Sequence, residues 1–402
     1  MFTHWDLFVS CFFEFEVYAP RVSFATRQRR CHDTGMRPLL LSLAILMMLT
    51  TPLFAGIDPQ RLKHGVNLSH WYAQWGTYDE QRLSTYFTER DMKLIAQMGF
   101  SHVRLTLSES VAFDSAKPGG LNADHLKRLR QRIDRIVDHK LAVVVDLHPE
   151  TPYKKALQDD PKSADAFVAV WSALAKALSD TDPSWVALEV MNEPDPNHGE
   201  AWRALQLRAV EAIRAAAPGH TIVVSPGAWT SVKDLIEFKP YAHPNLIYTF
   251  HFYDPHIYTH QAASWGWIVA QKVKNLDWPV DPADAQRVTD AATQDPEGRK
   301  HLKWQIEQGW FTQEWIGAEF DKVVLWQKTN GNPPVYLGEF GVYTKAAPPA
   351  GRLRWYQAVR EEAEKRGFAW SIWDYAGGFQ VVTGEPGSRK PDEEMLKALG
   401  LK

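Results

Sequence analysis

Two glutamates that follow apolar runs are the residues of this sequence best suited to chemistry. Glu193 comes directly after the run that starts at Trp185 and after Asn192, and Glu339 ends the run that starts at Val335. A carboxylate at the end of a buried strand is costly to desolvate, so such a position indicates that the carboxylate has a functional role. Cleavage of a glycosidic bond requires such a pair: one carboxylic acid to protonate the leaving oxygen and one carboxylate to attack the anomeric carbon. The elements around these residues must bring their side chains face to face.

Short apolar or β-branched runs alternate along the chain with stretches that have helical periodicity. In stretches such as 125–137 and 167–178, apolar residues recur at spacings of three and four, which is typical of amphipathic helices. Alternation of this kind predicts a single α/β domain, a closed (β/α)8 or TIM barrel with eight parallel strands. The predicted strands are 63–67, 102–105, 141–146, 186–191, 221–225, 246–250, 335–337 and 368–372.

A doubly wound open sheet is the structural alternative. It would show a Gly-rich turn after the first strand, and the stretch 65–69, Gly-Val-Asn-Leu-Ser, is not one. In a parallel barrel the chemistry lies at the carboxyl ends of the strands. Polar or aromatic residues stand at nearly all of the predicted ends: Asn67, Arg104, His148, Asn192, Glu193, His251, Tyr253, Glu339 and Trp373.

The segment between predicted strands 6 and 7 is far longer than one return helix needs. Residues 313–326 can form the barrel helix, and residues 258–309 form a long insertion with four Trp. Long connections on the catalytic face of a barrel commonly shape the substrate cleft, which we expect here. A structural lid or an oligomer contact is the alternative.

The first 55 residues have the features of a targeting segment rather than of a folded domain. A short positive start at Met36, an apolar stretch over 39–49 and a small residue before Gly56 predict a secretory signal peptide over 36–55. Residues 1–35 precede a complete signal and are interpreted as a start-site extension, which leaves 56–402 as the catalytic domain. We therefore expect a secreted or periplasmic protein, with no stable membrane insertion because the apolar stretch is too short to span.

The composition describes an ordinary globular protein and excludes several classes of site. The 402 residues are 45% hydrophobic and 23% charged with a net charge of -3, and the absence of a basic run argues against a nucleic-acid partner. Both cysteines, Cys11 and Cys31, precede the mature chain, which excludes disulfides, thiol catalysis and Cys-ligated metal from it. His256 and His260 lie near Asp254 but form no compact ligand set, so neither a metal nor a cofactor is expected. The seventeen Trp exceed the needs of a core; we expect about half to fill the layers between helices and sheet, and flat rings exposed along a cleft are the usual means of stacking on sugars.

Seven motifs occur in the order found in glycoside hydrolase family 5, the cellulase-like retaining β-glycosidases, and the chain resembles that family from Gly65 to Trp373. Asn-Glu-Pro alone is a weak match, but the ordered set is specific. The motifs are Gly65-Val66-Asn67, His102-Val103-Arg104-Leu105, Asp146-Leu147-His148, Leu188-Glu189-Val190-Met191-Asn192-Glu193-Pro194, His251-Phe252-Tyr253, Gly338-Glu339-Phe340-Gly341 and Trp370-Ser371-Ile372-Trp373.

The resemblance implies Glu193 as the acid/base and Glu339 as the nucleophile. The nucleophile must stay ionised, and Arg104 and Tyr253 are its implied partners. The acid must hold its proton near neutral pH, so its pKa should be raised by burial and by its anionic neighbour. Glu189, on the same predicted strand as Asn192, is expected to face the barrel core or a buried Arg.

The remaining residues of the set are expected to bind substrate. By resemblance, Asn192 would contact the sugar 2-hydroxyl, His148 and His251 would line the subsite beside the cleaved bond, and Trp373 would form its stacking floor. We also count Asn67, Arg104 and Tyr253, at this end of the barrel, among the substrate-binding residues. His70 and Trp71, just beyond the first predicted strand, are further candidates for a sugar subsite, and we include Trp71 among the substrate-binding residues.

The sequence thus predicts a secreted retaining β-glycosidase that hydrolyses a β-linked glucan, in the manner of an endoglucanase, by double displacement. Its partner is a polysaccharide or oligosaccharide. The alternatives are an exo-β-1,3-glucosidase or transglycosylase on the same scaffold, and a carbohydrate-binding barrel without turnover. In several branches of the family a polar or aromatic residue follows the third-strand His, whereas Pro149 and Glu150 follow it here. The sequence therefore assigns neither the glucan linkage nor an oligomeric state.

Overall fold

The computed structural model describes residues 56–114, 116–194 and 199–402. The predicted start-site extension, the signal peptide and both cysteines lie outside these residues. Within the described part, none of the helices combines the length and the apolar character needed to cross a bilayer.

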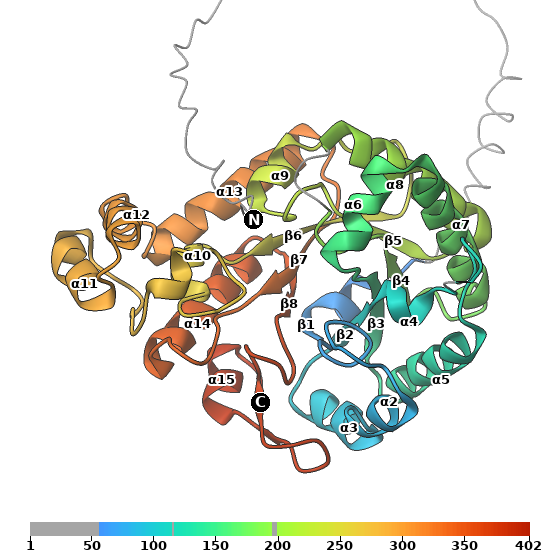
Figure 1. Cartoon of the computed structure of the whole chain (residues 1–402), viewed down its shortest axis with the longest axis horizontal. Helices are drawn as coiled ribbons and strands as arrows, with labels where there is room; N and C mark the ends of the chain where they lie inside the picture. Colours follow the sequence, from blue (N-terminus) through green and yellow to red (C-terminus); the bar gives the residue numbers. More distant parts are fainter. Residues whose placement is uncertain (1–55, 115, 195–198) are drawn as a thin grey trace, which may run out of the picture. The chain divides into compact units, whose positions relative to one another are not determined.

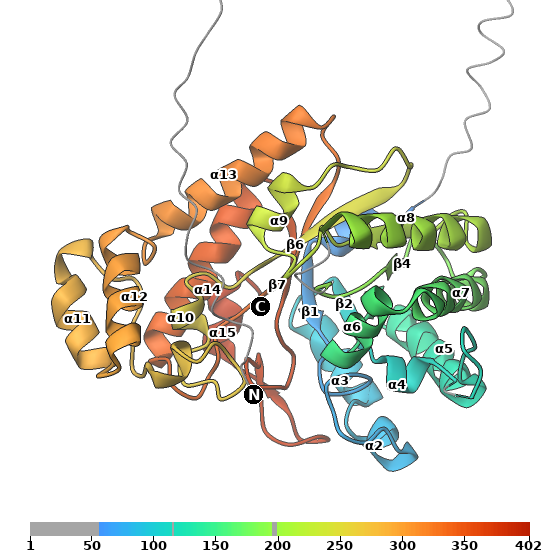
Figure 2. The same ribbon diagram turned by 45° about the horizontal axis from the view of Figure 1, so that its top comes forward.

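Eight parallel strands close into one barrel in sequence order, so β1 pairs with both β2 and β8 (Figures 1 and 2). This confirms the predicted fold. The central strands read as continuous β-branched and apolar runs because helices cover their outer side and side chains fill the interior; all six residues of β3 are buried. The strands are β1 His64–Asn67, β2 His102–Leu107, β3 Ala142–Leu147, β4 Val186–Glu189, β5 Thr221–Val224, β6 Leu246–Phe252, β7 Val335–Phe340 and β8 Ala369–Ile372.

Helices surround the barrel, and side-chain caps mark where several of them begin. Asn122 caps α5, and Asp160 accepts from the first amides of α7, which starts with Pro161. The helices outside the β6–β7 segment are α2 Glu80–Thr85, α3 Glu89–Gln97, α4 Glu109–Ala112, α5 Ala123–Asp138, α6 Thr151–Asp159, α7 Pro161–Leu178, α8 Gly199–Ala216, α9 Val232–Glu237, α14 Pro349–Lys365 and α15 Glu393–Ala398, with the short 3-10 turn η1 Pro59–Leu62 before β1 and the small hairpin β9 Val382–Thr383 and β10 Lys390–Pro391 after β8.

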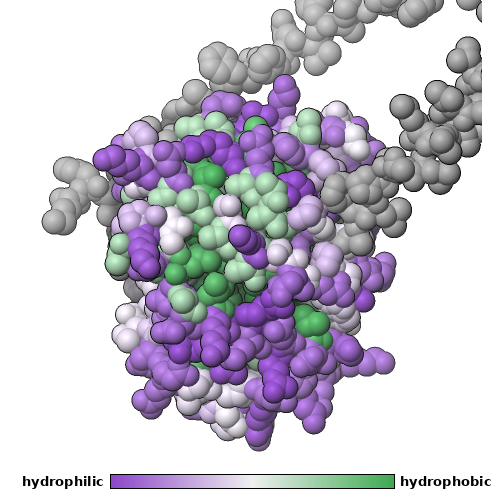
Figure 3. All heavy atoms as spheres, turned by 90° about the vertical axis from the view of Figure 1, so that its right-hand side faces the viewer, coloured by the Kyte–Doolittle hydropathy of each residue, from purple (hydrophilic) through white to green (hydrophobic). Residues whose placement is uncertain are grey.

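The outer faces of these helices form the ordinary solvated exterior of the barrel. On α5, for example, Leu129, Ile133 and Ile136 are buried, whereas Lys127 and Asp134 are exposed. Figure 3 looks onto the side of the molecule where α5 and α7 lie and shows an apolar area within a mostly hydrophilic surface.

The segment between β6 and β7 carries several helices before it reaches the barrel helix α13, Gln313–Thr329, which lies where the sequence predicted it. The additional elements are α10 His256–Thr259, η2 Ala270–Lys272, η3 Pro282–Asp284, α11 Ala285–Ala292 and α12 Pro296–Glu307. In both ribbon views α11 and α12 project beyond the ring of barrel helices, opposite α5 (Figures 1 and 2).

Candidate active site

Glu193 and Glu339 meet at the carboxyl ends of the strands. Glu193 lies four residues beyond the end of β4, with φ at +39°, a backbone region that a non-glycine residue rarely adopts. Glu339 is the second-last residue of β7. A carboxylate oxygen of each glutamate and one ring nitrogen of His251 all lie within 4.8 Å of one another. Retaining glycosidases hold their carboxyl groups about 5–5.5 Å apart, whereas inverting enzymes leave about 6.5–9.5 Å for a water. The spacing here matches the retaining geometry.

Two donors hold the buried carboxylate of Glu339. Arg104 donates from Nη1 to Oε1 over 2.6 Å, and the Tyr253 hydroxyl donates to Oε2 over 2.8 Å. Burial raises the pKa of Tyr253 well above its ordinary value, so its phenol keeps the proton that it donates. Gly338 precedes the glutamate because a Cβ there would stand 2.5 Å from Thr249 Oγ1 on the neighbouring strand. Arg104 and Tyr253 therefore hold both oxygens of Glu339 near the end of β7.

Arg104 is the centre of a buried charge network. Its Nε and Nη2 donate to the two oxygens of Glu189 over 2.8 and 2.7 Å, and Nη2 also lies 3.0 Å from Asp146 Oδ2. The three neighbouring carboxylates raise the pKa of Arg104 well above its ordinary value, against the effect of burial. The expectation that Glu189 faces a buried Arg agrees with this contact. A fixed guanidinium with so many partners orients groups rather than binding ligand.

Asn67 and Arg104 do not line the substrate site, contrary to our expectation. Both side chains are fully buried, and both are saturated by protein groups. Asn67 accepts from Arg104 Nη1 over 2.9 Å and donates from Nδ2 to the backbone carbonyls of Gly338 and Ile372, each over 3.0 Å. These two residues join the ends of β1, β2, β7 and β8 and so position Glu339. The sequence indicated their place at the strand ends but not their inward direction.

Glu193 differs from Glu339 in its surroundings. Its side chain is 22% exposed, and its Oε1 lies 2.9 Å from Nδ1 of His251. Burial raises the pKa of Glu193, while the positive charge of Lys154 acts in the opposite direction. Of the two causes expected from the sequence, burial is the one that raises the pKa of Glu193 here. A carboxyl group of this kind can hold a proton and remain accessible to a ligand.

A relay of hydrogen bonds orients Asn192. Burial lowers the pKa of His148 to about 3, so its ring is neutral; Nδ1 lies 2.8 Å from Asp146 Oδ2 and Nε2 lies 3.2 Å from Asn192 Nδ2. Because Asp146 accepts from Nδ1–H, Nε2 is the acceptor for the amide of Asn192. The Asn192 Oδ1 accepts from Arg104 Nη2 over 3.0 Å. No role for Asp146 was predicted from the sequence, although residues two apart along a strand share a face, and the spacing between Asp146 and His148 was the available signal.

Comparisons with known proteins identify the family of this chain. The family model described as cellulase, glycosyl hydrolase family 5, matches residues 63–378. The chain belongs to glycosyl hydrolase family 5. Membership confirms the resemblance drawn from the motifs, and this family-5 protein is a glycoside hydrolase.

Several family-5 relatives can be named. Endoglucanase 3 of Fibrobacter succinogenes is 27% identical over 357 residues, which cover 85% of this chain but only 53% of that protein. Endoglucanase C of Acetivibrio thermocellus is 23% identical over 78% of this chain and 91% of its own length. Among solved structures, Thermotoga maritima Cel5A in complex with cellobiose has a TM-score of 0.69 at 26% identity, covering 85% of this chain and all of that chain.

Trp373 lies beside His148 at the carboxyl ends of the strands. Its ring stacks on that of His148, with the centroids 5.5 Å apart and an angle of 18° between the ring planes. The exposed fraction of the residue is 8%. It packs with Tyr343, Phe379 and Ala263. Ala263 belongs to the long β6–β7 segment, so the first part of that segment contacts Trp373. That the segment shapes the substrate cleft stays a prediction.

Trp71 is a correction to the predicted site. The residue has no exposed surface, its Nε1 donates to the Leu83 carbonyl over 3.0 Å, and its ring packs against Tyr72 and Phe87 at 4.6 and 4.7 Å. It fills the core beneath the β1–α2 loop and cannot stack on a sugar. Of the sixteen Trp among the described residues, eight are buried, so the expectation that about half fill the core holds.

The residues that could hold a cation are the catalytic candidates themselves. In the described part of the chain, Glu193, His251 and Glu339 form the one cluster compact enough for an ion. Arg104, 2.6 Å from Glu339, already supplies the positive charge there, and a second cation would be repelled. His256 and His260 stack on each other with centroids 4.0 Å apart and do not converge with Asp254 on a common point.

Proposed function

We propose that this family-5 hydrolase is an exported, endo-acting β-glucanase that works by double displacement, with Glu339 as nucleophile and Glu193 as acid/base. The single observation that carries the assignment is that one carboxyl oxygen of each glutamate lies within 4.8 Å of the other. The unequal surroundings of the pair support the division of roles. Glu339 is held by Arg104 and Tyr253, whereas burial raises the pKa of Glu193.

In the first step the Glu339 carboxylate attacks the anomeric carbon. The bond from that carbon to the leaving oxygen breaks, and the proton of Glu193 passes to this oxygen, which leaves a glycosyl ester on Glu339. In the second step Glu193, now a carboxylate, removes a proton from water. The resulting oxygen attacks the anomeric carbon, the ester bond breaks, and Glu339 and the protonated Glu193 are restored.

The neighbouring side chains suit these steps. Asn192 uses Oδ1 on Arg104 and one amide hydrogen on His148, so its second amide hydrogen is available for the 2-hydroxyl of the sugar. Burial lowers the pKa of His251 to about 4, so the ring stays neutral beside Glu193 and does not draw the proton away from it as an imidazolium would. Trp373 supplies an apolar surface for the sugar ring.

A β-glucan is the substrate class we propose, because family-5 relatives of this chain are named endoglucanases and a similar structure holds cellobiose. Export rests on the signal predicted over 36–55. Hydrolysis by an exo-β-1,3-glucosidase, transglycosylation, and a carbohydrate-binding barrel without turnover are the alternatives that a test must separate.

The test is a screen of the purified protein on β-1,4-, β-1,3- and mixed-linkage glucans and on mannan, with product lengths resolved over time. We expect early products of many lengths from a β-glucan, with a Glu339→Gln variant as the inactive control. Release of glucose alone from chain ends would indicate the exo-enzyme, and products longer than an oligosaccharide substrate would indicate transglycosylation. No turnover on any of these polymers would contradict the proposal.

A further inference from the structure

The indole of Trp373 is held in place without a hydrogen bond. Its ring stacks on His148 and packs with Tyr343, Phe379 and Ala263, and its Nε1 bonds to none of the described residues. A side chain that binds a ligand keeps its geometry only when the residues behind it are fixed by packing and hydrogen bonds. The groups that fix the backbone around residue 373 therefore decide how the ring is oriented.

Asp374, the residue after Trp373, has a fully buried carboxyl group with three donors. Its Oδ1 accepts from the amides of Gly377 and Phe379 over 3.1 and 3.4 Å, and its Oδ2 accepts from the Ser69 hydroxyl. Burial raises the pKa of Asp374, and the three donors act in the opposite direction. One carboxyl group thus closes the loop after β8 on itself and joins it to the loop after β1.

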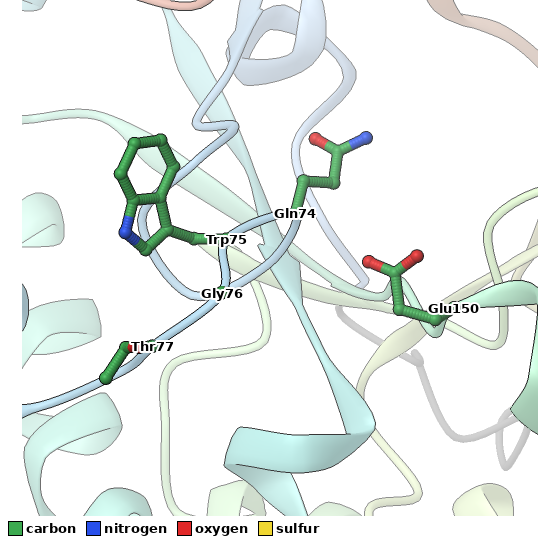
Figure 4. Close-up of a pocket in the computed structure, with 5 residues that line it drawn as sticks. All are labelled: Gln74, Trp75, Gly76, Thr77 and Glu150. Carbon is green, nitrogen blue, oxygen red and sulfur yellow. The ribbon is translucent and has the colours of Figure 1, made fainter. Parts of the chain in front are cut away.

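The loop after β1 is open to solvent at its outer end and tightly packed at its inner end. Figure 4 shows its outer residues 74–77 around a hollow of about 640 Å³, opposite Glu150 of the loop after β3. At the inner end, a Cβ on Gly377 would collide with the Asp374 carboxyl group and stand 2.8 Å from the His70 ring. Asp374 therefore fixes the point at which the loops after β1 and β8 meet.

Tyr356, on α14, fixes the same stretch of backbone from the helix side. Its buried hydroxyl accepts from the Val342 amide over 3.1 Å and lies 3.3 and 3.2 Å from the carbonyl oxygens of Trp373 and Phe379, to which it can donate. Burial raises the pKa of Tyr356 to about 12, so the hydroxyl keeps its proton. One hydroxyl thus joins the backbone after β7 to both ends of the loop that carries Asp374.

We propose that Asp374 and Tyr356 are positioning residues that hold the Trp373 ring in the orientation in which it supports the sugar. Neither of the two side chains has exposed surface, so the substrate cannot touch them. The inference rests on the proposed function, in which Trp373 supplies the apolar surface for the sugar ring. A ring that is fixed in advance loses less entropy when a sugar covers it.

A double-mutant cycle with Trp373→Ala tests this proposal. The value of kcat/KM on a β-1,4-gluco-oligosaccharide is measured for Asp374→Ala and for Tyr356→Phe, each in the wild-type and in the Trp373→Ala background. With Trp373 present, we expect Asp374→Ala to lower kcat/KM about thirtyfold and Tyr356→Phe about fivefold, because small displacements of a positioning group are costly. In the Trp373→Ala background both losses should shrink to less than about twofold, since the ring that they position is gone.

Two further variants separate positioning from a loss of stability. Tyr248→Phe is the matched control, because the buried Tyr248 hydroxyl also accepts from a backbone amide, that of Tyr241, over 2.8 Å, while its ring packs on Trp326. It should lower the melting temperature about as much as Tyr356→Phe and leave kcat/KM unchanged. Asp374→Asn keeps an oxygen for the two amides and an NH₂ group for the Ser69 hydroxyl, so kcat/KM should stay within about twofold of the wild-type value.

Equal losses in both backgrounds would overturn the proposal, because they would show that the two residues do not act through Trp373. Unchanged kcat/KM for Asp374→Ala would also overturn it. If Asp374→Ala fails to fold, Tyr356→Phe completes the same cycle.

A second measurement does not depend on glucan turnover. In protein labelled with fluorotryptophan, the fluorine NMR signal of Trp373, assigned from Trp373→Phe, should shift or broaden in Asp374→Ala and Tyr356→Phe but not in Tyr248→Phe. A signal that stays unchanged in both would contradict the positioning role even if the wild type hydrolyses glucan. A wild type without activity on any β-glucan would remove the proposed function, and the fluorine signal would still show whether the two residues hold the ring.

Discussion

The Nδ1 atom of His251 lies 2.9 Å from Oε1 of Glu193 and 3.6 Å from Oε2 of Glu339, so one ring nitrogen faces both carboxyl groups. Burial lowers the pKa of His251 to about 4, so the ring is neutral. A neutral imidazole has one nitrogen that donates a hydrogen bond and one that accepts. The His251 ring thus lies between Glu193, which must give up a proton, and Glu339, which must remain a carboxylate. The two glutamates can thus stand close together with one of them protonated.

Replacing Glu339 by Ala should abolish turnover without unfolding the protein. The variant loses the nucleophile, and we expect kcat to fall by at least about three orders of magnitude. Arg104 keeps Glu189 and Asp146 as partners, so the buried guanidinium remains paired. Steady-state assays together with a thermal melt would check both points. Hydrolysis at the wild-type rate would contradict the assignment.

Replacing Glu193 by Ala should lower the rate of hydrolysis by a factor that depends on the leaving group. Loss of a general acid typically costs about 10²–10⁴-fold for a poor leaving group, and much less when the leaving group needs no protonation. An activated aryl glycoside should therefore form the glycosyl-enzyme but release it slowly. Added azide, which needs no general base, should restore turnover and yield a β-glycosyl azide. An equal loss on all substrates, without rescue by azide, would argue against the acid/base role.

Lys154 should set the upper pH limit of activity. It lines a hollow with Met191 and Pro194, on either side of Asn192 and Glu193, and its charge lowers the pKa of Glu193. The first step needs protonated Glu193, so kcat/KM is lost as the pH rises through that pKa. Lys154→Met should raise the pKa and move the basic limb of the profile to higher pH. The exposed neighbour Lys155→Met is the matched control, and a basic limb that stays in place or moves downward for Lys154→Met would contradict this account.

Trp71 and Trp373 should respond differently to removal. Trp71 is a core residue, so Trp71→Ala should lower the free energy of unfolding by about 3–5 kcal/mol and leave KM near the wild-type value below its melting temperature. Trp373→Ala should mainly reduce kcat/KM, because we propose that its ring, which stacks near His148, supports the reacting sugar. Urea unfolding and steady-state kinetics on both variants make the comparison. A large rise in KM for a stable Trp71→Ala would return that residue to the substrate site.

The strands and the residues at their ends could be predicted because a buried parallel strand has a plain signature in sequence. The runs at 141–146 and 335–337 are apolar and β-branched, and a carboxylate or imidazole at the end of such a run stands out. What the sequence could not supply was the direction of each side chain. Asn67 and Arg104 point into the barrel and serve Glu339, and Trp71 turns into the core, since all three are decided by packing between elements far apart in the chain.

The exposure of side chains in loops could not be predicted from the sequence either. Trp75 lies four residues beyond Trp71 in the same loop, and no periodicity distinguishes the exposed ring from the buried one. Its position depends on Arg82 and Tyr78, whose contacts form only when the loop has folded back. Asp146 was visible beside His148, but its hydrogen bond needed the register of the strand to be known.

The stereochemistry of the first product tests the two-glutamate mechanism most directly. Two inversions at one carbon give net retention, so proton NMR recorded during the first turnovers of a β-glucan oligosaccharide should show the β-anomer of the new reducing end before mutarotation. The approach of the Glu193 and Glu339 carboxyl groups to within 4.8 Å predicts that result. Initial appearance of the α-anomer would show direct attack by water and would contradict Glu339 as the nucleophile.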